Sequence, residues 1–105
     1  MKKTSPLQVL GDFSMGEDTL VIHPNDGFDL DIMTTSQPVY IYNGATLDQF
    51  QKDEGDKLSG KILLKNECRL GTVEMSKKSW EKIGKPKKVI LFIDEHKLLV
   101  MPAQA

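Results

Sequence analysis

The sequence predicts one β-rich α+β domain, built as a small sheet or barrel of about seven strands with two short helices. Short runs of β-branched and aromatic residues recur along the chain between turn residues, which is typical of a sheet of short strands. Only two stretches carry the capping residues of a helix. With 105 residues the chain is long enough to bury one core, so a single domain over residues 1–105 is expected.

The first half of the chain contains two plain strand signals. Residues 1–15 have no clean hydrophobic period, so we expect a loosely ordered stretch that becomes a strand only partway along. Residues 19–23 and 39–42 are rich in β-branched and aromatic side chains, and turn residues follow each run. Both runs are therefore predicted to be strands.

A third strand is expected at residues 28–33, where apolar and acidic side chains alternate. Its core-facing residues would be Phe28, Leu30 and Ile32, and its water-facing residues Asp29 and Asp31. Two neighbouring acids also suit a metal or catalytic site, but alternating acids are more typical of the wet face of a sheet. We interpret His23 as a strand-end residue, because no second histidine lies nearby to share a metal.

Both helices are predicted from their ends. Thr46 and Gln49 have the spacing of a capping box, which indicates a helix from residue 47 to about 53. Ser76 is a good N-cap for a second helix, and Gly84 stands where a left-handed residue is needed to end it.

The last third of the chain has the most complete pattern, a ββαββ unit over residues 61–103. Its strands and helix are expected at residues 61–65, 69–75, 76–84, 88–94 and 97–101. Met75 and Trp80 have the spacing of a hydrophobic staple, which predicts that Trp80 is buried. Residues 89–93 are apolar at every position, so both faces of that strand should be buried, in a barrel or in a dimer.

Charge is divided unevenly although the net charge is only −1. Residues 1–59 carry four lysines and ten acidic residues, whereas residues 60–105 carry ten basic and five acidic residues. This asymmetry indicates either an interaction surface or two separately solvated halves. The candidate partner- or anion-binding residues are Lys77, Lys78, Lys82, Lys85, Lys87 and Lys88. An acidic protein surface is the expected partner, because a net-acidic chain repels duplex DNA at long range.

Three segments of the ββαββ unit resemble the AbrB-type swapped-hairpin family and its MraZ and MazE relatives. These segments are Leu70–Ser76, Ser79–Gly84 and Val89–Val100. The family pattern that they resemble is a strand ending in a Leu-Gly-Arg-Val-like run, a short helix ending in Leu-Gly, and two strands around an acidic turn. The resemblance implies an obligate dimer with interleaved hairpins, in which the first hairpin binds DNA. The DNA-binding residues that it implies are Lys61, Lys65 and Arg69.

Cys68 is the single cysteine, which excludes an internal disulfide and a cysteine-based metal site. We interpret it as a buried residue rather than a reactive thiol, because no histidine is placed beside it in sequence. The chain has no Gly-rich phosphate loop, no Cys-x-x-Cys pair and no His-Glu-x-x-His motif. No catalytic residue, metal or cofactor is therefore predicted.

These observations favour a small non-enzymatic binding or assembly module, an adaptor that acts through protein–protein contacts as a homodimer. The alternative is a swapped-hairpin DNA-binding regulator or antitoxin-like protein, and an enzyme is a third hypothesis. No apolar run follows the basic start as in a signal peptide, and none approaches the length of a spanning helix. We therefore expect a cytoplasmic protein with no membrane contact.

Overall fold

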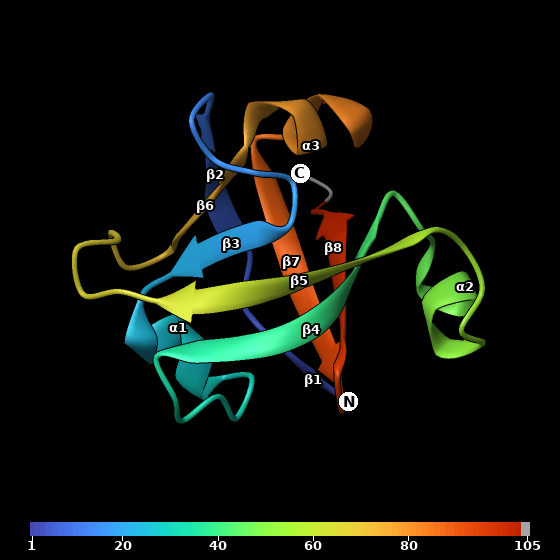
Figure 1. The fold of residues 1–105 in the computed structure, drawn as a ribbon, viewed down its shortest axis with the longest axis horizontal. Coiled ribbons are helices and arrows are strands. Elements are labelled where there is room, and N and C mark those ends of the chain that lie inside the picture. The colour runs from blue at the N-terminus through green and yellow to red at the C-terminus, as the bar shows by residue number, and fades with distance from the viewer. Residues whose placement is uncertain (104–105) are drawn as a thin grey trace.

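The computed structural model describes residues 1–103, and Figure 1 shows the arrangement of the strands and helices in this part of the chain. The strands are β1 (Lys2–Lys3), β2 (Leu7–Asp12), β3 (Thr19–Ile22), β4 (Ser36–Asn43), β5 (Lys57–Leu64), β6 (Thr72–Ser76), β7 (Lys88–Asp94) and β8 (Lys97–Pro102). The helices are α1 (Pro24–Phe28), α2 (Leu47–Gln51) and α3 (Lys77–Lys82). None of the helices in the described residues is long and apolar enough to cross a membrane.

Seven of the strands close into a barrel. Around it the order is β7, β2, β6, β3, β5, β4 and β8, and β8 pairs again with β7. The pairs β2–β6, β3–β5 and β4–β8 are parallel, and the other neighbours are antiparallel. β1 lies outside the closed ring and pairs with β7. The predicted β-rich α+β class, with a barrel of about seven strands, is confirmed.

β2 is the strand that was expected partway along residues 1–15. It pairs in parallel with β6 and antiparallel with β7, and its Leu7 side chain is fully buried. The chain before β2 also follows β7, because the Thr4 N–H donates to the Leu91 carbonyl at 3.0 Å. The Thr4 hydroxyl in turn accepts the Leu91 N–H at 3.2 Å. The N-terminal segment is therefore part of the barrel wall.

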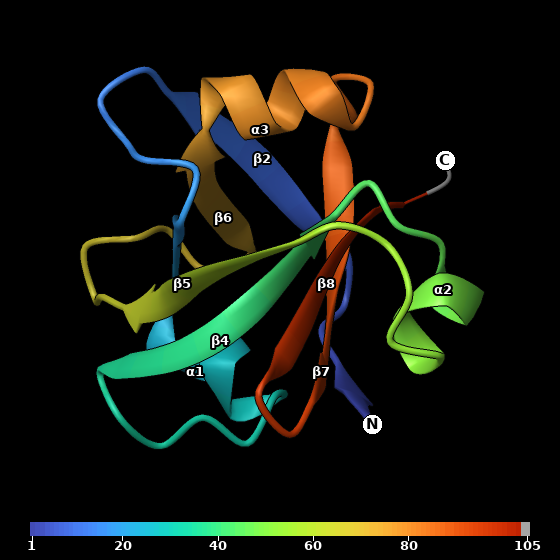
Figure 2. The same ribbon diagram turned by 45° about the vertical axis from the view of Figure 1, so that its right-hand side comes forward.

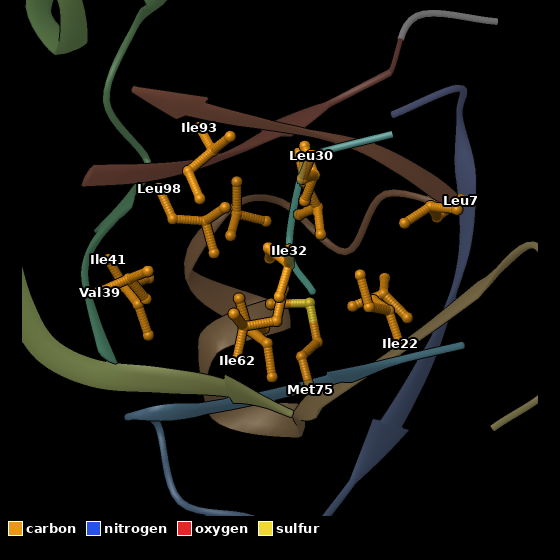
Figure 3. Close-up of a cluster of buried hydrophobic side chains, with 14 of the residues drawn as sticks. Leu7, Ile22, Leu30, Ile32, Val39, Ile41, Ile62, Met75, Ile93 and Leu98 are labelled. Carbon is orange, nitrogen blue, oxygen red and sulfur yellow. The ribbon is translucent and has the colours of Figure 1, made fainter. Parts of the chain in front are cut away.

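Different segments close the two ends of the barrel (Figure 2). α3 lies across one end, where Trp80 and Ile83 pack on the core. Residues 24–35, which contain α1, lie at the other end and bury Leu30 and Ile32. Between the two ends, inward side chains from all seven barrel strands form one cluster (Figure 3).

The prediction of two helices was wrong, because a third helix, α1, follows β3. His23 comes directly after β3, as expected, but its side chain also caps this helix: Nδ1 accepts the N–H of Asn25 at 3.0 Å. Pro24 occupies the first helical position, where its missing N–H would have no partner in any case. Histidine is an unusual N-cap, so the capping preferences of helices do not predict that a helix starts here.

Residues 28–33 do not form the expected strand. The Ile32 N–H donates to the carbonyl of Gly27 at 3.1 Å, so the backbone pairs with itself in a turn rather than with another strand. Phe28, expected in the core, is 68% exposed. The other side chains lie on the expected sides, with Leu30 and Ile32 buried and Asp29 and Asp31 exposed. A turn that inserts two apolar residues into a barrel end thus gives the same alternation as a strand.

A second hydrophobic cluster lies outside the barrel, beneath α2. Its buried members are Tyr42, Phe50, Phe92 and Leu99. The rings of Tyr42 and Phe50 meet edge to face, with centroids 5.1 Å apart. β7 therefore has one face buried inside the barrel and the other buried under α2. The burial of both faces predicted for residues 89–93 is confirmed, and a single chain provides it.

Polar contacts hold α2 on this second cluster. The helix starts with the expected capping box. Lys97 Nζ donates to the carbonyl of Phe50 at 3.2 Å, and the Tyr42 hydroxyl donates to the carboxylate of Asp53. Burial, followed by the contact with Asp53, raises the pKa of Tyr42 to about 12. α2 is therefore held in place by the packing of its apolar face and by polar contacts at its C-terminal end.

Candidate functional site

The lysines that the sequence singles out surround α3, and local signals fix that helix in place. The Ser76 hydroxyl accepts the N–H of Ser79 at 3.0 Å, as predicted for an N-cap. Gly84 has a φ of 91° and ends the helical segment, also as predicted. Trp80 packs on the core, but its side chain is only partly buried rather than buried as predicted. Its Nε1 donates to the carbonyl of Pro86 at 2.7 Å, which keeps one edge of the ring at the link to β7.

The six candidate lysines divide into two groups. Three lie on α3, and three lie in the link to β7 or at its first residue: Lys77, Lys78 and Lys82, then Lys85, Lys87 and Lys88. Lys82 Nζ is 2.9 Å from a carboxylate oxygen of Glu17. The other five have no acidic partner within 4.0 Å among residues 1–103. One lysine of the set is therefore neutralised by an internal ion pair, and the rest keep an uncompensated charge.

An exposed aromatic residue lies beside the first group of lysines. Phe13, in the loop between β2 and β3, is 84% exposed. Lys77 Nζ lies 4.0 Å from the centroid of its ring, within the range of a cation–π contact. Leu10 on β2 is also exposed, at 54%. We call Leu10, Phe13, Lys77 and Lys78 the α3 surface.

Phe13 could not be assigned to this site from the sequence. No aromatic residue other than Trp80 is interleaved with the lysines, and Phe13 is distant from them along the chain. The parallel register places Asp12 beside Ser76, so the residues after β2 lie next to the first residues of α3. The sequence shows only a single phenylalanine in a short turn between strands, and this pattern does not predict which residues lie beside it.

Two lysines of α3 stabilise the ionised form of Glu17. Its hydrogen-bonded contact with Lys82 lowers the pKa of the Glu17 carboxyl below its ordinary value, and Lys78 contributes in the same direction. Glu17 therefore stays ionised and ties the β2–β3 loop to α3. The loop that carries Phe13 is positioned by this ion pair as well as by β2.

The DNA-binding residues implied by the family resemblance lie elsewhere. Lys61 is on β5, Lys65 follows β5 directly, and Arg69 is in the loop before β6, and all three are exposed. β6 separates that loop from α3, and its five residues span about 16 Å. Lys65 and Arg69 therefore lie toward the end of β6 that is far from α3. Lys61 pairs with Thr19 at the start of β3, so it lies two strands from β6 at the α3 end. β5 and β6 are also not neighbours, because β3 lies between them in the barrel.

Cys68 is buried and unpaired, as interpreted from the sequence. Burial, with a further contribution from Glu74, raises the pKa of its thiol to about 12. Because the thiolate is the reactive form, this environment disfavours nucleophilic chemistry at Cys68. Within residues 1–103, no group of three or more His, Cys, Asp or Glu side chains is placed to hold a metal ion.

Comparisons with protein-family models, with curated proteins and with solved structures found no match. The resemblance of residues 61–103 to the swapped-hairpin family therefore stays a prediction. Among the described residues, the α3 surface combines an exposed aromatic side chain with unpaired positive charge.

Proposed function

We propose that this protein is a small non-enzymatic binding module whose α3 surface docks on an acidic protein partner. One observation carries the proposal: Phe13 is 84% exposed and lies against Lys77, which has no acidic partner within 4.0 Å among residues 1–103. Aromatic residues are enriched at the energetic centres of protein interfaces, so an exposed phenylalanine beside a lysine suits such a centre. Charged residues suit the rim around such a centre.

The partner's chemistry follows from the two parts of this surface. Phe13 and Leu10 supply apolar area that a partner side chain would bury, which provides affinity. Lys77 and Lys78 would meet carboxylates at the rim, which mainly speeds association and makes it sensitive to salt. We therefore expect an acidic segment that carries at least one large apolar side chain.

Duplex DNA is the alternative partner, in the role of a swapped-hairpin regulator or antitoxin-like protein. It would be contacted by Lys61, Lys65 and Arg69, which lie apart from the α3 surface. Affinity for DNA grows with the number of phosphates that a basic surface neutralises at once. Lys65 and Arg69 lie far from the lysines of α3, and the chain has a net charge of −1, so its basic residues supply fewer such contacts than one continuous patch, which favours the protein partner.

Homodimerisation is a separate part of the proposal. A swapped first hairpin would require β5 and β6 to leave β3, with which both now pair. Size-exclusion chromatography with light scattering would decide the matter. A monomeric mass at high protein concentration would rule out the interleaved dimer and leave the α3 surface as the only proposed contact.

Titration of the isotope-labelled protein with a random copolymer of glutamate and tyrosine tests the function. We expect amide shifts at residues 10–14 and 77–78 that weaken as salt is added, because exposed charges are screened. Polyglutamate, which lacks the aromatic group, should bind more weakly. Tight binding of a short duplex DNA, with no shifts caused by the copolymer, would overturn the proposal and favour the regulator.

Two matched double variants locate the contact. Lys77→Glu with Lys78→Glu should weaken copolymer binding about tenfold, or about 1.4 kcal/mol. Lys65→Glu with Arg69→Glu makes the same change of charge at two exposed residues far from α3 and should leave copolymer binding within about twofold. Both variants should fold, because exposed basic side chains contribute little to stability. Equal losses in both would show attraction to net charge rather than a docking site.

A further inference from the structure

Residues 28–33 form an exposed turn at the end of the barrel that is opposite α3. Two apolar side chains of this turn lie in solvent, because Phe28 is 68% exposed and Met33 is 78% exposed. After Phe13, they are the most exposed large apolar side chains of the part of the chain that the structure describes. We call residues 28–33 the acidic turn, for the charge described next.

Carboxylates surround these two apolar side chains. Asp29 is exposed and has no basic partner within 4.0 Å among the described residues, and Asp31, also exposed, lies 3.6 Å from Lys2. Asp94 and Glu95, where β7 ends, line a cavity together with Asp31 and have no ion pair in the described part of the chain. The carboxylates here therefore outnumber the one lysine and the N-terminal amino group.

The acidic turn and the α3 surface match in composition and are opposite in charge. Each presents two exposed apolar side chains beside two residues of a single charge sign. Lys77 and Lys78 have no acidic partner within 4.0 Å among residues 1–103, just as Asp29 has no basic one. The acidic turn therefore has the chemistry expected of the partner of the α3 surface, an acidic segment that carries large apolar side chains.

The two surfaces cannot meet within one molecule. In Figure 1, α3 lies at the top of the barrel, whereas the acidic turn and the β7–β8 turn lie at the bottom. The loop between β5 and β6, which carries Lys65 and Arg69, projects to the left of that view, away from the β7–β8 turn. The complementary surfaces can therefore come together only between two copies of the chain.

We propose that the α3 surface of one molecule docks on the acidic turn of a second copy of this chain. The inference rests on the proposed function, because it names the acidic partner of the α3 surface. Phe13 and Phe28 supply the apolar contact, and Lys77 and Lys78 face Asp29 across it. Complementary charges of this kind speed association and make it sensitive to salt.

The contact is heterologous, since it joins two different surfaces. Each contact uses one end of each molecule and leaves the other end free, so copies add head to tail. Each surface contributes only a few side chains, and interfaces below about 1,200 Å² are typically transient. The association should therefore be reversible and should grow with protein concentration.

Light scattering over a range of protein concentrations tests the association. We expect the average mass to rise continuously as the concentration increases to about 1 mM, and the rise to shrink as salt is added. An interleaved dimer would instead keep a fixed dimeric mass, because its exchanged strands do not depend on exposed charges. A monomeric mass throughout, or a fixed dimeric mass, would overturn the proposal.

A charge reversal with a matched control locates the contact. Asp29→Lys should weaken self-association about tenfold. Glu54→Lys makes the same change of charge at an exposed acid after α2 that has no ion pair among the described residues, and it should change self-association by less than about twofold. Equal losses in both variants would indicate an effect of net charge, and no loss in Asp29→Lys would mean that the α3 surface meets another surface. Either outcome would overturn the proposal.

Mixing two disabled variants tests the head-to-tail arrangement. Phe28→Ala with Asp29→Lys disables the acidic turn, and Lys77→Glu with Lys78→Glu disables the α3 surface. Each variant alone should stay monomeric at concentrations where the parent protein associates. An equal mixture retains one working surface of each kind, so it should form pairs and stop there. A mixture that stays monomeric would overturn the proposal.

Copolymer binding separates this proposal from the proposed function. The variant with Phe28→Ala and Asp29→Lys keeps its α3 surface, so in dilute solution it should bind the copolymer of glutamate and tyrosine as the parent protein does. If the parent protein binds the copolymer but never self-associates, the second copy is wrong as the partner and the α3 surface remains a docking site. If the parent protein does neither, both proposals fail.

Discussion

The two ends of the barrel are closed by segments that hold their positions in different ways. At one end, Ser76 caps α3 and Gly84 ends the segment, so the helix is fixed by residues within or beside it. At the other end, His23 caps α1, but the position of residues 24–35 also depends on contacts with distant parts of the chain. The comparison shows that a segment defined by its own caps can be predicted from sequence, whereas one defined by the space it fills cannot.

The distant contacts at the α1 end are specific. The carboxylate of Asp26 is buried and accepts the N–H of Gly71 at 2.8 Å. Gly27 lies against Leu64, and a Cβ added there would be 2.6 Å from Leu64 Cδ2. Each contact joins residues that are far apart in sequence, so no local pattern announces it. Tertiary packing decides this segment, as it does wherever propensity is weak.

Truncating Leu30, at the α1 end of the barrel, should cause the largest loss of stability. Leu30 is 2% exposed and fills the core from a turn, so Leu30→Ala should leave a cavity and lower the free energy of unfolding by about 3 kcal/mol. Urea denaturation measures the loss. Phe28→Ala, next to it and 68% exposed, is the matched control and should cost less than about 1 kcal/mol. Equal costs would contradict the proposed packing of this turn.

Truncating Trp80 should have a smaller effect at the α3 end. Because the ring is only partly buried, Trp80→Ala should cost about 2 kcal/mol, less than a fully buried Trp would. Trp80→Phe keeps most of the packing but loses the hydrogen bond to Pro86, for about 1 kcal/mol. Native fluorescence emission between the values for buried and free tryptophan would agree with partial burial. A fully blue-shifted emission would contradict it.

The same contrast explains what could be predicted from the sequence. α3, β7, β8 and the start of α2 were predicted within a few residues, because caps, glycines and apolar runs are local. The lysines of α3 were found through the charge asymmetry. Phe13 was not, because the parallel β2–β6 pairing brings it to α3. The family resemblance implied that β5 and β6 form a hairpin, but β3 lies between them.

Backbone conformation gives a sharper comparison of the two ends. Gly84 has a φ of 91°, and Gly84→Ala should cost about 1 to 2 kcal/mol, because a side chain disfavours the left-handed region. Asp31 has a φ of 58° and already bears a side chain there. Asp31→Gly removes the strain of this positive φ but raises the conformational entropy of the unfolded chain. The two effects oppose each other, so the free energy of unfolding should change by less than about 0.5 kcal/mol. Urea midpoints of both variants test the difference, and a large loss for Asp31→Gly would show that its side chain is needed.

The smallest expected effect is the pH dependence of the α3 end. Lys82 lowers the folded-state pKa of Glu17 below its ordinary value of 4.5. The stabilisation from this ion pair is therefore fully present above the unfolded-state pKa and is lost as pH falls through the folded-state pKa. Glu17→Gln should be less stable than the parent protein at neutral pH, and the difference should vanish on acidification and shrink in high salt.

A double variant decides whether charge is the cause. If the ion pair carries the effect, adding Lys82→Gln to Glu17→Gln should cost nothing further, because the interaction is already gone. A stability difference that persists unchanged at low pH would mean that Glu17 acts through packing instead. The β2–β3 loop and its Phe13 would then be held by packing rather than by the charge of Glu17.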